Sequence, residues 1–124
     1  MSAGTEDPRR VLVVEDDGLL REALLLALAR RGFEARGAAD GRTAYQEFFT
    51  FYPRYAVVDL GLPVLDGLRL ARMVRVRPAG RGAVLVALTA RYGADAERAA
   101  AAAGFDALLT KPADLEEVVA ALRR

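Results

Sequence analysis

The fold is decided by the stretch AVVDLGLPVLDG, which runs from Ala56 to Gly67. It opens with a short apolar run that stops at a single carboxylate, Asp59. Gly61 and Pro63 then interrupt the backbone pattern, and Asp66-Gly67 is typical of the start of a helix. Because acidic residues are poor strand formers, an Asp that closes a β-branched run is ordinarily a turn residue. Features elsewhere in the chain favour a chemical role for Asp59 instead.

Other polar residues also close apolar runs. Glu15-Asp16-Asp17 follows the run from Val11 to Val14, and Thr89 ends the run from Ala83 to Leu88. Lys111 closes the last one. Runs of this kind, without polar alternation, are typical of strands buried on both faces of a parallel sheet.

Helical patterns separate the predicted strands. We expect strands at residues 11–14, 33–38, 55–58, 83–88 and 105–109, and helices at residues 19–31, 42–50, 66–76, 94–103 and 114–124. Residues 78–82 are predicted to be a turn-rich connector. The last helix begins with Asp114 and Glu117, the spacing of a capping box.

This alternation predicts an α/β fold with a single five-stranded parallel sheet, in the flavodoxin-like, doubly wound arrangement with five helices. The expected strand order is 2-1-3-4-5. We expect residues 1–10 to be a flexible N-terminal tail and residues 11–124 to form one domain, which is long enough to bury a core without disulfides.

Composition excludes several classes of function. The formal net charge of the 124-residue chain is +1, which does not favour direct binding of nucleic acid or of an acidic membrane surface. No apolar run is long enough to span a bilayer, and the N-terminus lacks the apolar segment of a signal peptide, so we expect a cytoplasmic protein. The chain has no cysteine and no histidine, which removes thiol nucleophiles, imidazole bases and the common zinc sites.

The basic residues are strongly biased toward arginine. The chain has 18 basic residues, and Lys111 is the only lysine among them. Lysine carries a compact charge on a thin stem, whereas guanidinium is a broad planar fork. A lone lysine could be an accident of composition, but its place at a strand end favours a chemical role.

The predicted topology brings these polar residues together. In an open α/β sheet the carboxyl ends of the strands meet at one edge, and ligands bind where the strand order reverses. Asp16 and Asp59 would then lie side by side, with Thr89 and Lys111 flanking Asp59. Clustered carboxylates repel one another, and an oxygen-rich site of this kind suits Mg²⁺ or Mn²⁺. With the cation bound, a carboxylate could attack a phosphoryl group, whose transfer needs mainly positioning and charge neutralisation.

Four motifs resemble those of the response-regulator receiver domain of two-component signalling, of the chemotaxis-regulator-like kind. They are LVVEDD, AVVDLGLPVLDG, ALTA and LLTKPADLEEV, and the resemblance extends from Val11 to Leu122. It implies that Asp59 accepts a phosphoryl group from the phosphohistidine of a sensor histidine kinase or phosphotransfer protein.

The resemblance also implies roles for the neighbouring residues. Glu15, Asp16 and Asp59, with the backbone carbonyl of Gly61, would organise Mg²⁺ or Mn²⁺, and Thr89 and Lys111 would bind the phosphoryl group. The Lys111–Pro112 peptide bond would be cis. Such a domain is a phosphoacceptor with weak self-phosphorylation and self-dephosphorylation activity, not an enzyme in the usual sense. Its output would pass to a downstream protein or to an attached output domain.

One position departs from the family pattern. Receivers usually carry a switching aromatic residue three positions before the lysine, and here Leu108 takes that place. A core leucine has no ring or hydroxyl to report phosphorylation, and Tyr92 is a candidate substitute. The departure favours an alternative function, in which a pseudo-receiver acts as a phosphorylation-independent interaction module. A flavodoxin-like cofactor binder is a third alternative, which the acidic Glu15-Asp16-Asp17 disfavours because it would repel a bare phosphate.

Overall fold

The computed structural model describes residues 9–62, 64–91 and 93–123. Five parallel strands form one sheet in the order β2-β1-β3-β4-β5, which confirms the predicted topology. The strands are β1 (Arg10–Val14), β2 (Glu34–Ala38), β3 (Tyr55–Asp59), β4 (Val84–Thr89) and β5 (Ala107–Thr110). The described helices are α1 (Gly18–Arg30), α2 (Gly41–Glu47), α3 (Gly67–Arg75), α4 (Pro78–Arg81), α5 (Ala94–Ala103) and α6 (Leu115–Leu122).

The prediction of five helices was wrong by one short helix. The segment expected to be a connector, residues 78–82, contains the single turn α4. Pro78 stands at the first helical position, where its fixed φ favours the turn and its missing N–H costs nothing. Gly80 is buried so closely against Val74 that a Cβ atom there would lie 2.3 Å from the Val74 carbonyl oxygen. The glycine that suggested a loop is therefore required by packing.

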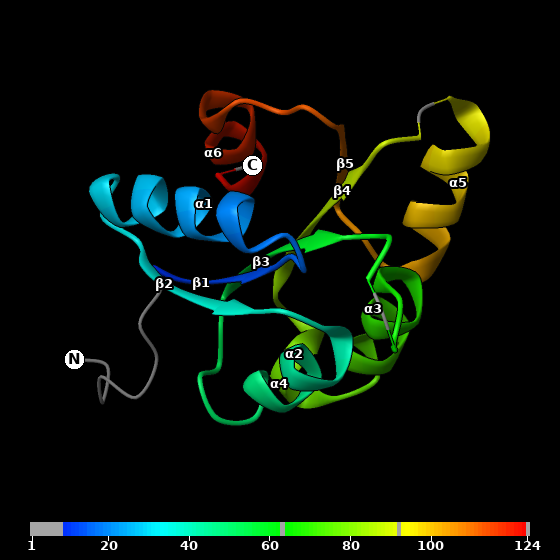
Figure 1. Ribbon diagram of the computed structural model, residues 1–124. Helices are drawn as coiled ribbons and strands as arrows, with labels where there is room; N and C mark the ends of the chain where they lie inside the picture. Colours follow the sequence, from blue (N-terminus) through cyan, green and yellow to red (C-terminus); the bar gives the residue numbers. More distant parts are fainter. Residues whose placement is uncertain (1–8, 63, 92, 124) are drawn as a thin grey trace.

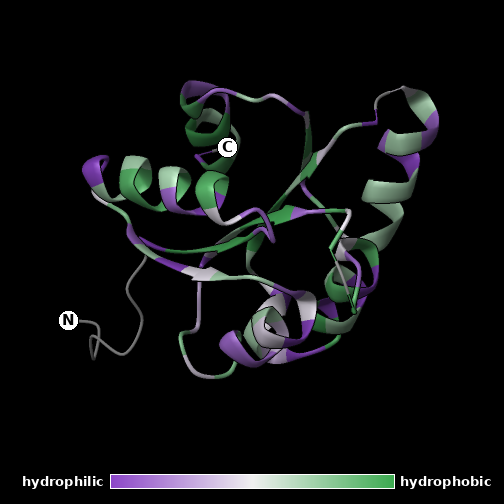
Figure 2. Cartoon of the chain, in the orientation of Figure 1, coloured by the Kyte–Doolittle hydropathy of each residue, from purple (hydrophilic) through white to green (hydrophobic). Residues whose placement is uncertain are grey.

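Helices cover both faces of the sheet, as Figure 1 shows. Helices α1 and α6 lie on one face, and α2, α3, α4 and α5 lie on the other. Strands β1, β3 and β4 in the middle of the sheet are mostly apolar and buried, visible as the green centre of Figure 2, whereas the edge strand β2 is largely polar. No helix in the described part of the chain is long and apolar enough to cross a membrane.

Strand alternation divides the core into two clusters. Side chains along a strand point alternately to opposite faces, so Val13 and Val57 pack against α1 and α6 whereas Val14 and Val58 pack against the other helices. The β1–β3 register pairs Val14 with Val58, and its continuation places Glu15 beside Asp59. These two carboxylates follow Val13 and Val57 in alternation, so both belong to the α1–α6 side of the sheet. Register alone thus makes them neighbours.

Side chains near the carboxyl edge of the sheet cap the starts of two helices. Asp17 caps α1 by accepting hydrogen bonds from the amides of Leu19 and Leu20. Asp114 and Glu117 form the capping box that was predicted for the last helix. Four residues, 111–114, separate the end of β5 from the start of α6. The connection that carries Lys111 is therefore short and held at both ends.

Arg75 ties together the segments around α4. Its guanidinium donates hydrogen bonds to the carbonyl oxygens of Gly80 and Arg81 in α4, of Ala83 just after α4 and of Gly104 at the α5–β5 turn. It also donates to the Asp106 carboxylate at 2.8 Å. Asp106 in turn accepts a hydrogen bond from the Leu85 amide. One side chain thereby joins α3, α4, β4 and the start of β5.

We predict that Arg75→Ala lowers the free energy of unfolding by about 2–4 kcal/mol, because it removes a network of charge-assisted hydrogen bonds. The matched control is Arg98→Ala, which removes an exposed pair with Asp95 within one helix turn and should cost less than about 0.5 kcal/mol. Urea unfolding of both variants measures the difference. Equal losses would show that Arg75 makes no special contribution.

Candidate functional site

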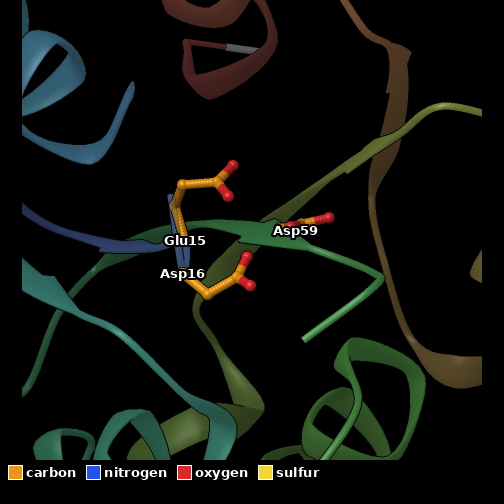
Figure 3. A group of neighbouring side chains, drawn as sticks. All are labelled: Glu15, Asp16 and Asp59. Atoms are coloured by element: carbon orange, nitrogen blue, oxygen red, sulfur yellow. The ribbon is translucent and has the colours of Figure 1, made fainter. Parts of the chain in front are cut away.

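Three carboxylates meet at the carboxyl edge of the sheet. Glu15 and Asp16 follow β1, and Asp59 is the last residue of β3. Figure 3 shows the three side chains extending from these two neighbouring strands into one region. One oxygen from each residue can be chosen so that all three lie within 4.8 Å of one another. The predicted convergence of Asp16 and Asp59 is therefore present, and Glu15 joins them.

Glu15 is the most deeply buried of the three, at 1% exposure. Its carboxylate accepts hydrogen bonds from the Lys111 ammonium at 3.0 Å and from the Asp17 amide at 3.1 Å. Burial raises the pKa of Glu15 above its usual value, against the opposing effect of these two hydrogen bonds. Arg21 donates to the Glu15 carbonyl at 2.7 Å and so fixes the backbone at the strand end.

Lys111 is the cation of the site. Its Nζ atom lies 3.0 Å from Glu15 Oε1 and 3.4 Å from Asp59 Oδ2. Burial by itself would lower the pKa of Lys111, but the hydrogen bond to Glu15 and the charge of Asp59 outweigh it and raise the pKa of the ammonium. Lys111 therefore stays charged and bridges two carboxylates. The Lys111–Pro112 peptide bond is cis, as predicted.

Asp59 and Thr89 are each held by a local backbone contact. Asp59 is 8% exposed, and its Oδ1 accepts a hydrogen bond from the Gly61 amide at 3.0 Å. Thr89 ends β4 and is 7% exposed, and its hydroxyl oxygen accepts from the Arg91 amide at 3.0 Å. A hydroxyl whose oxygen accepts a hydrogen bond can still donate its own hydrogen to another group. The predicted role of the Gly61 carbonyl as a metal ligand stays a prediction.

The residues present fit a hard divalent cation. Three carboxylates and one ammonium carry a net charge of about −2 when all are ionised, which a divalent cation would balance. Mg²⁺ binds oxygen at about 2.0–2.1 Å, so two oxygens on the same ion lie no more than about 4 Å apart, and the three carboxylate oxygens, within 4.8 Å of one another, are close to that limit. Asp16 is exposed, which leaves room on its side for water ligands. Glu15, Asp16 and Asp59 are thus the residues that would hold the ion.

A cleft opens beside Asp59 on the α3–α5 side. Its volume is about 440 Å³, and Thr89 and Lys111 line it together with Asp59. Further lining comes from Leu60, Leu68, Ala96 and Ala99, which sequence reasoning did not assign to the site. Those residues come from a loop and from helix faces, where a core position and a cleft wall give the same apolar signal. Arg91 also lines the cleft and was noted only for its spacing from Thr89.

Two of the sequence predictions concern residues proposed for the conformational switch, and these residues are not among those that form the acidic site. Leu108 is half-buried in β5 and packs against the core on the α2–α3–α5 side. No finding tests how it affects switching, so its role stays a prediction. Tyr92, the suggested substitute, lies outside the described residues.

We predict that Asp16→Asn weakens Mg²⁺ binding about tenfold or more, since it removes one anionic ligand from the cluster. Asp17→Asn is the matched control, because Asp17 caps α1 and asparagine caps equally well. Thermal unfolding across a Mg²⁺ titration reports the affinity as metal-dependent stabilisation. The metal assignment fails if the two variants lose affinity alike, or if neither does.

A family model supplies the first comparison with known proteins. The model of the response regulator receiver domain matches residues 11–123, nearly the whole chain. Among curated proteins, the virulence transcriptional regulatory protein PhoP of Salmonella typhimurium is 40% identical over 114 residues, which cover 92% of this chain and 50% of PhoP. The chain spans about half the length of the curated relatives it matches.

Solved structures of response regulators and receiver domains also resemble this chain. The chemotaxis response regulator CheY4 of Vibrio cholerae superposes with a TM-score of 0.87 at 26% identity, covering 93% of this chain and 96% of CheY4. The receiver domain of sensor histidine kinase PA1611 from Pseudomonas aeruginosa has a magnesium ion coordinated in its active site cleft; its TM-score is 0.85 at 28% identity, with 94% and 95% coverage.

A third solved structure contains the phosphorylated state. It is a response regulator from Burkholderia pseudomallei with a phosphorylated aspartic acid and a calcium ion, with a TM-score of 0.84 at 28% identity that covers 92% of this chain and 66% of that one. Sheet order, acidic edge and family match lead to one conclusion: this chain belongs to the response regulator receiver domain family, a family of phosphoacceptor signalling modules.

Proposed function

We propose that Asp59 of this chain accepts a phosphoryl group from the phosphohistidine of a histidine kinase or phosphotransfer protein, in a reaction that depends on Mg²⁺. The observation that carries the proposal is that Asp59 lies 3.4 Å from the Lys111 ammonium and within 4.8 Å of carboxylate oxygens of Glu15 and Asp16. A magnesium ion on the carboxylates would supply charge neutralisation for the phosphoryl oxygens. The relatives support this, since a homologous receiver holds magnesium and another carries phosphoaspartate.

The transfer itself asks for one nucleophile and a leaving group. An Asp59 carboxylate oxygen attacks phosphorus, the new P–O bond forms, and the P–N bond to the donor imidazole breaks. The imidazole leaves with the electron pair of that bond and takes up a proton. This chain has no histidine, so the donor belongs to another molecule or domain.

Two further side chains are assigned to the transferred group. The Thr89 hydroxyl, whose oxygen is already anchored by the Arg91 amide, donates to one phosphoryl oxygen. The Lys111 ammonium, now shared between Glu15 and Asp59, pairs with another. Phosphorylation would therefore draw Lys111 and Thr89 toward Asp59 and change the surface of the cleft. We propose that a downstream protein or an output domain reads this change, in line with PhoP being a transcriptional regulatory protein.

We predict a single phosphoryl adduct on the wild-type chain after incubation with a small-molecule phosphodonor and Mg²⁺, and none on Asp59→Asn. Asp66→Asn is the control, because Asp66 caps α3 and asparagine preserves that cap. Intact-mass measurement after a rapid quench, with and without Mg²⁺, decides the result. An adduct that survives in Asp59→Asn, or that forms equally well without Mg²⁺, would contradict the assignment.

We predict that Lys111→Arg keeps the positive charge but impairs switching, because a planar guanidinium cannot occupy the point between Glu15 and Asp59 as an ammonium does. The measurement is the change in the Thr89 amide NMR signal on phosphorylation, which should be much reduced. Arg98→Lys, an exposed swap in the reverse direction, is the control. A wild-type response in Lys111→Arg would overturn the role given to the lysine.

Leu108 favours a second candidate function, that of a phosphorylation-independent interaction module. Its aliphatic side chain gives β5 no aromatic group that could turn inward toward the cleft. The intact set of Glu15, Asp16, Asp59 and Lys111 weighs more heavily for phosphorylation. If the folded wild-type chain forms no phosphoryl adduct with the phosphodonor and Mg²⁺, the interaction module is the better assignment.

A further inference from the structure

A second polar cavity lies at the end of the sheet opposite the acidic edge, where β1 and β3 begin and where α1 and α6 end. Its volume is about 300 Å³. The described residues that line it are Arg9, Arg31, Gly32, Phe33, Tyr55 and Arg123. None of these lining residues is acidic, so the cavity carries the charge opposite to that of the functional site.

Two of the guanidinium groups, those at the helix ends, differ in their partners. Arg31, at the C-terminal end of α1, pairs with Glu116 of α6. Within the described ranges Arg123, at the end of α6, makes no side-chain hydrogen bond and is only attracted by the charge of Glu116. The helix dipole favours a cation at a helix C-terminus, which accounts for a basic residue at positions 31 and 123. It does not account for the two arginines lining one cavity beside an aromatic pair.

An aromatic pair forms the apolar wall. The rings of Phe33 and Tyr55 meet edge to face, with centroids 5.7 Å apart and planes at 85°, and both residues are only partly buried. Gly32 lies between Arg31 and this pair with φ of +91°, and a Cβ atom there would come within 3.3 Å of the Arg9 guanidinium. The glycine therefore lets a guanidinium lie close to bare backbone beside the rings.

We propose that this cavity binds a small organic phosphate with a planar ring, of the nucleoside monophosphate class. Guanidinium forks match phosphate oxygens in pairs, and planar rings stack on aromatic faces and on guanidinium planes. A cavity of about 300 Å³ stands at the lower end of the range for small-molecule sites, which suits a monophosphate better than a larger ligand. This site goes beyond the proposed phosphoacceptor function and shares no residue with it.

The test compares AMP, adenosine and inorganic phosphate as probes of the full chain by calorimetric titration, without Mg²⁺ and at about 0.15 M salt, where non-specific ionic attraction is largely screened. AMP should bind more tightly than either fragment. Arg123→Gln should weaken AMP binding about tenfold, the effect of losing one charge-assisted contact. Arg30→Gln is the matched control, since Arg30 is an exposed arginine next to Arg31 that does not line the cavity.

NMR titration with AMP gives the second readout, because shift changes should centre on Phe33 and Tyr55 and not on Asp59. The proposal is overturned if AMP does not bind, if inorganic phosphate binds as tightly as AMP, if Arg30→Gln weakens AMP binding as much as Arg123→Gln, or if the shift changes centre on the acidic edge. A change in stability alone in Arg123→Gln, with AMP affinity unchanged, would show a helix-capping role and also overturn the proposal. None of these results depends on whether Asp59 is phosphorylated.

Discussion

A shortage of positive charge at one edge of the sheet is the constraint on which the site depends. Glu15, Asp16 and Asp59 bring three carboxylates within 4.8 Å, and Lys111 is the ammonium that contacts two of them. Burial of uncompensated charge is costly, so this edge is arranged to take up a cation and then an anionic group beside it. In the described residues every buried side-chain nitrogen and oxygen has a hydrogen-bond partner. The unfavourable interaction in the cluster is therefore repulsion between carboxylates and not a missing hydrogen bond.

The parallel sheet explains why such distant residues share one site. Glu15 and Asp59 follow register partners on β1 and β3 and point to the same face, and Lys111 follows β5 on that face. Strand β4 separates β3 from β5, so the cation must reach across a strand to the carboxylates. A thin, four-carbon stem does this while leaving the cleft open, which gives a physical reason for the only lysine of an arginine-rich chain to stand here.

Much of this architecture could be predicted from sequence, because buried parallel strands leave continuous apolar runs and their ends meet at one edge. The strand order and the gathering of Asp16, Asp59, Thr89 and Lys111 were accessible in this way. The cis Lys111–Pro112 bond was expected only from the resemblance to receiver domains.

The remaining features depend on contacts between segments far apart in the sequence. Residues 78–82 looked like a loop because Pro78 and Gly80 are turn formers in isolation. They form a helical turn whose Gly80 packs against Val74, a contact that gives no local signal in the sequence. The walls of the cleft and the aromatic cavity at the far end were missed for the same reason, since Leu68 or Tyr55 gives no local signal beyond burial.

The most direct test of the central claim is the chemical identity of the phosphorylated residue. An acyl phosphate on aspartate is reduced by borohydride to homoserine, and peptide mass spectrometry then locates that residue after reaction with a phosphorylated histidine donor and Mg²⁺. The account predicts homoserine at position 59 and at no other carboxylate. Homoserine at Asp16 or Asp66, the one-carbon-longer alcohol 5-hydroxynorvaline at Glu15, or no reduced residue at all in a chain that still folds and binds Mg²⁺, would contradict it.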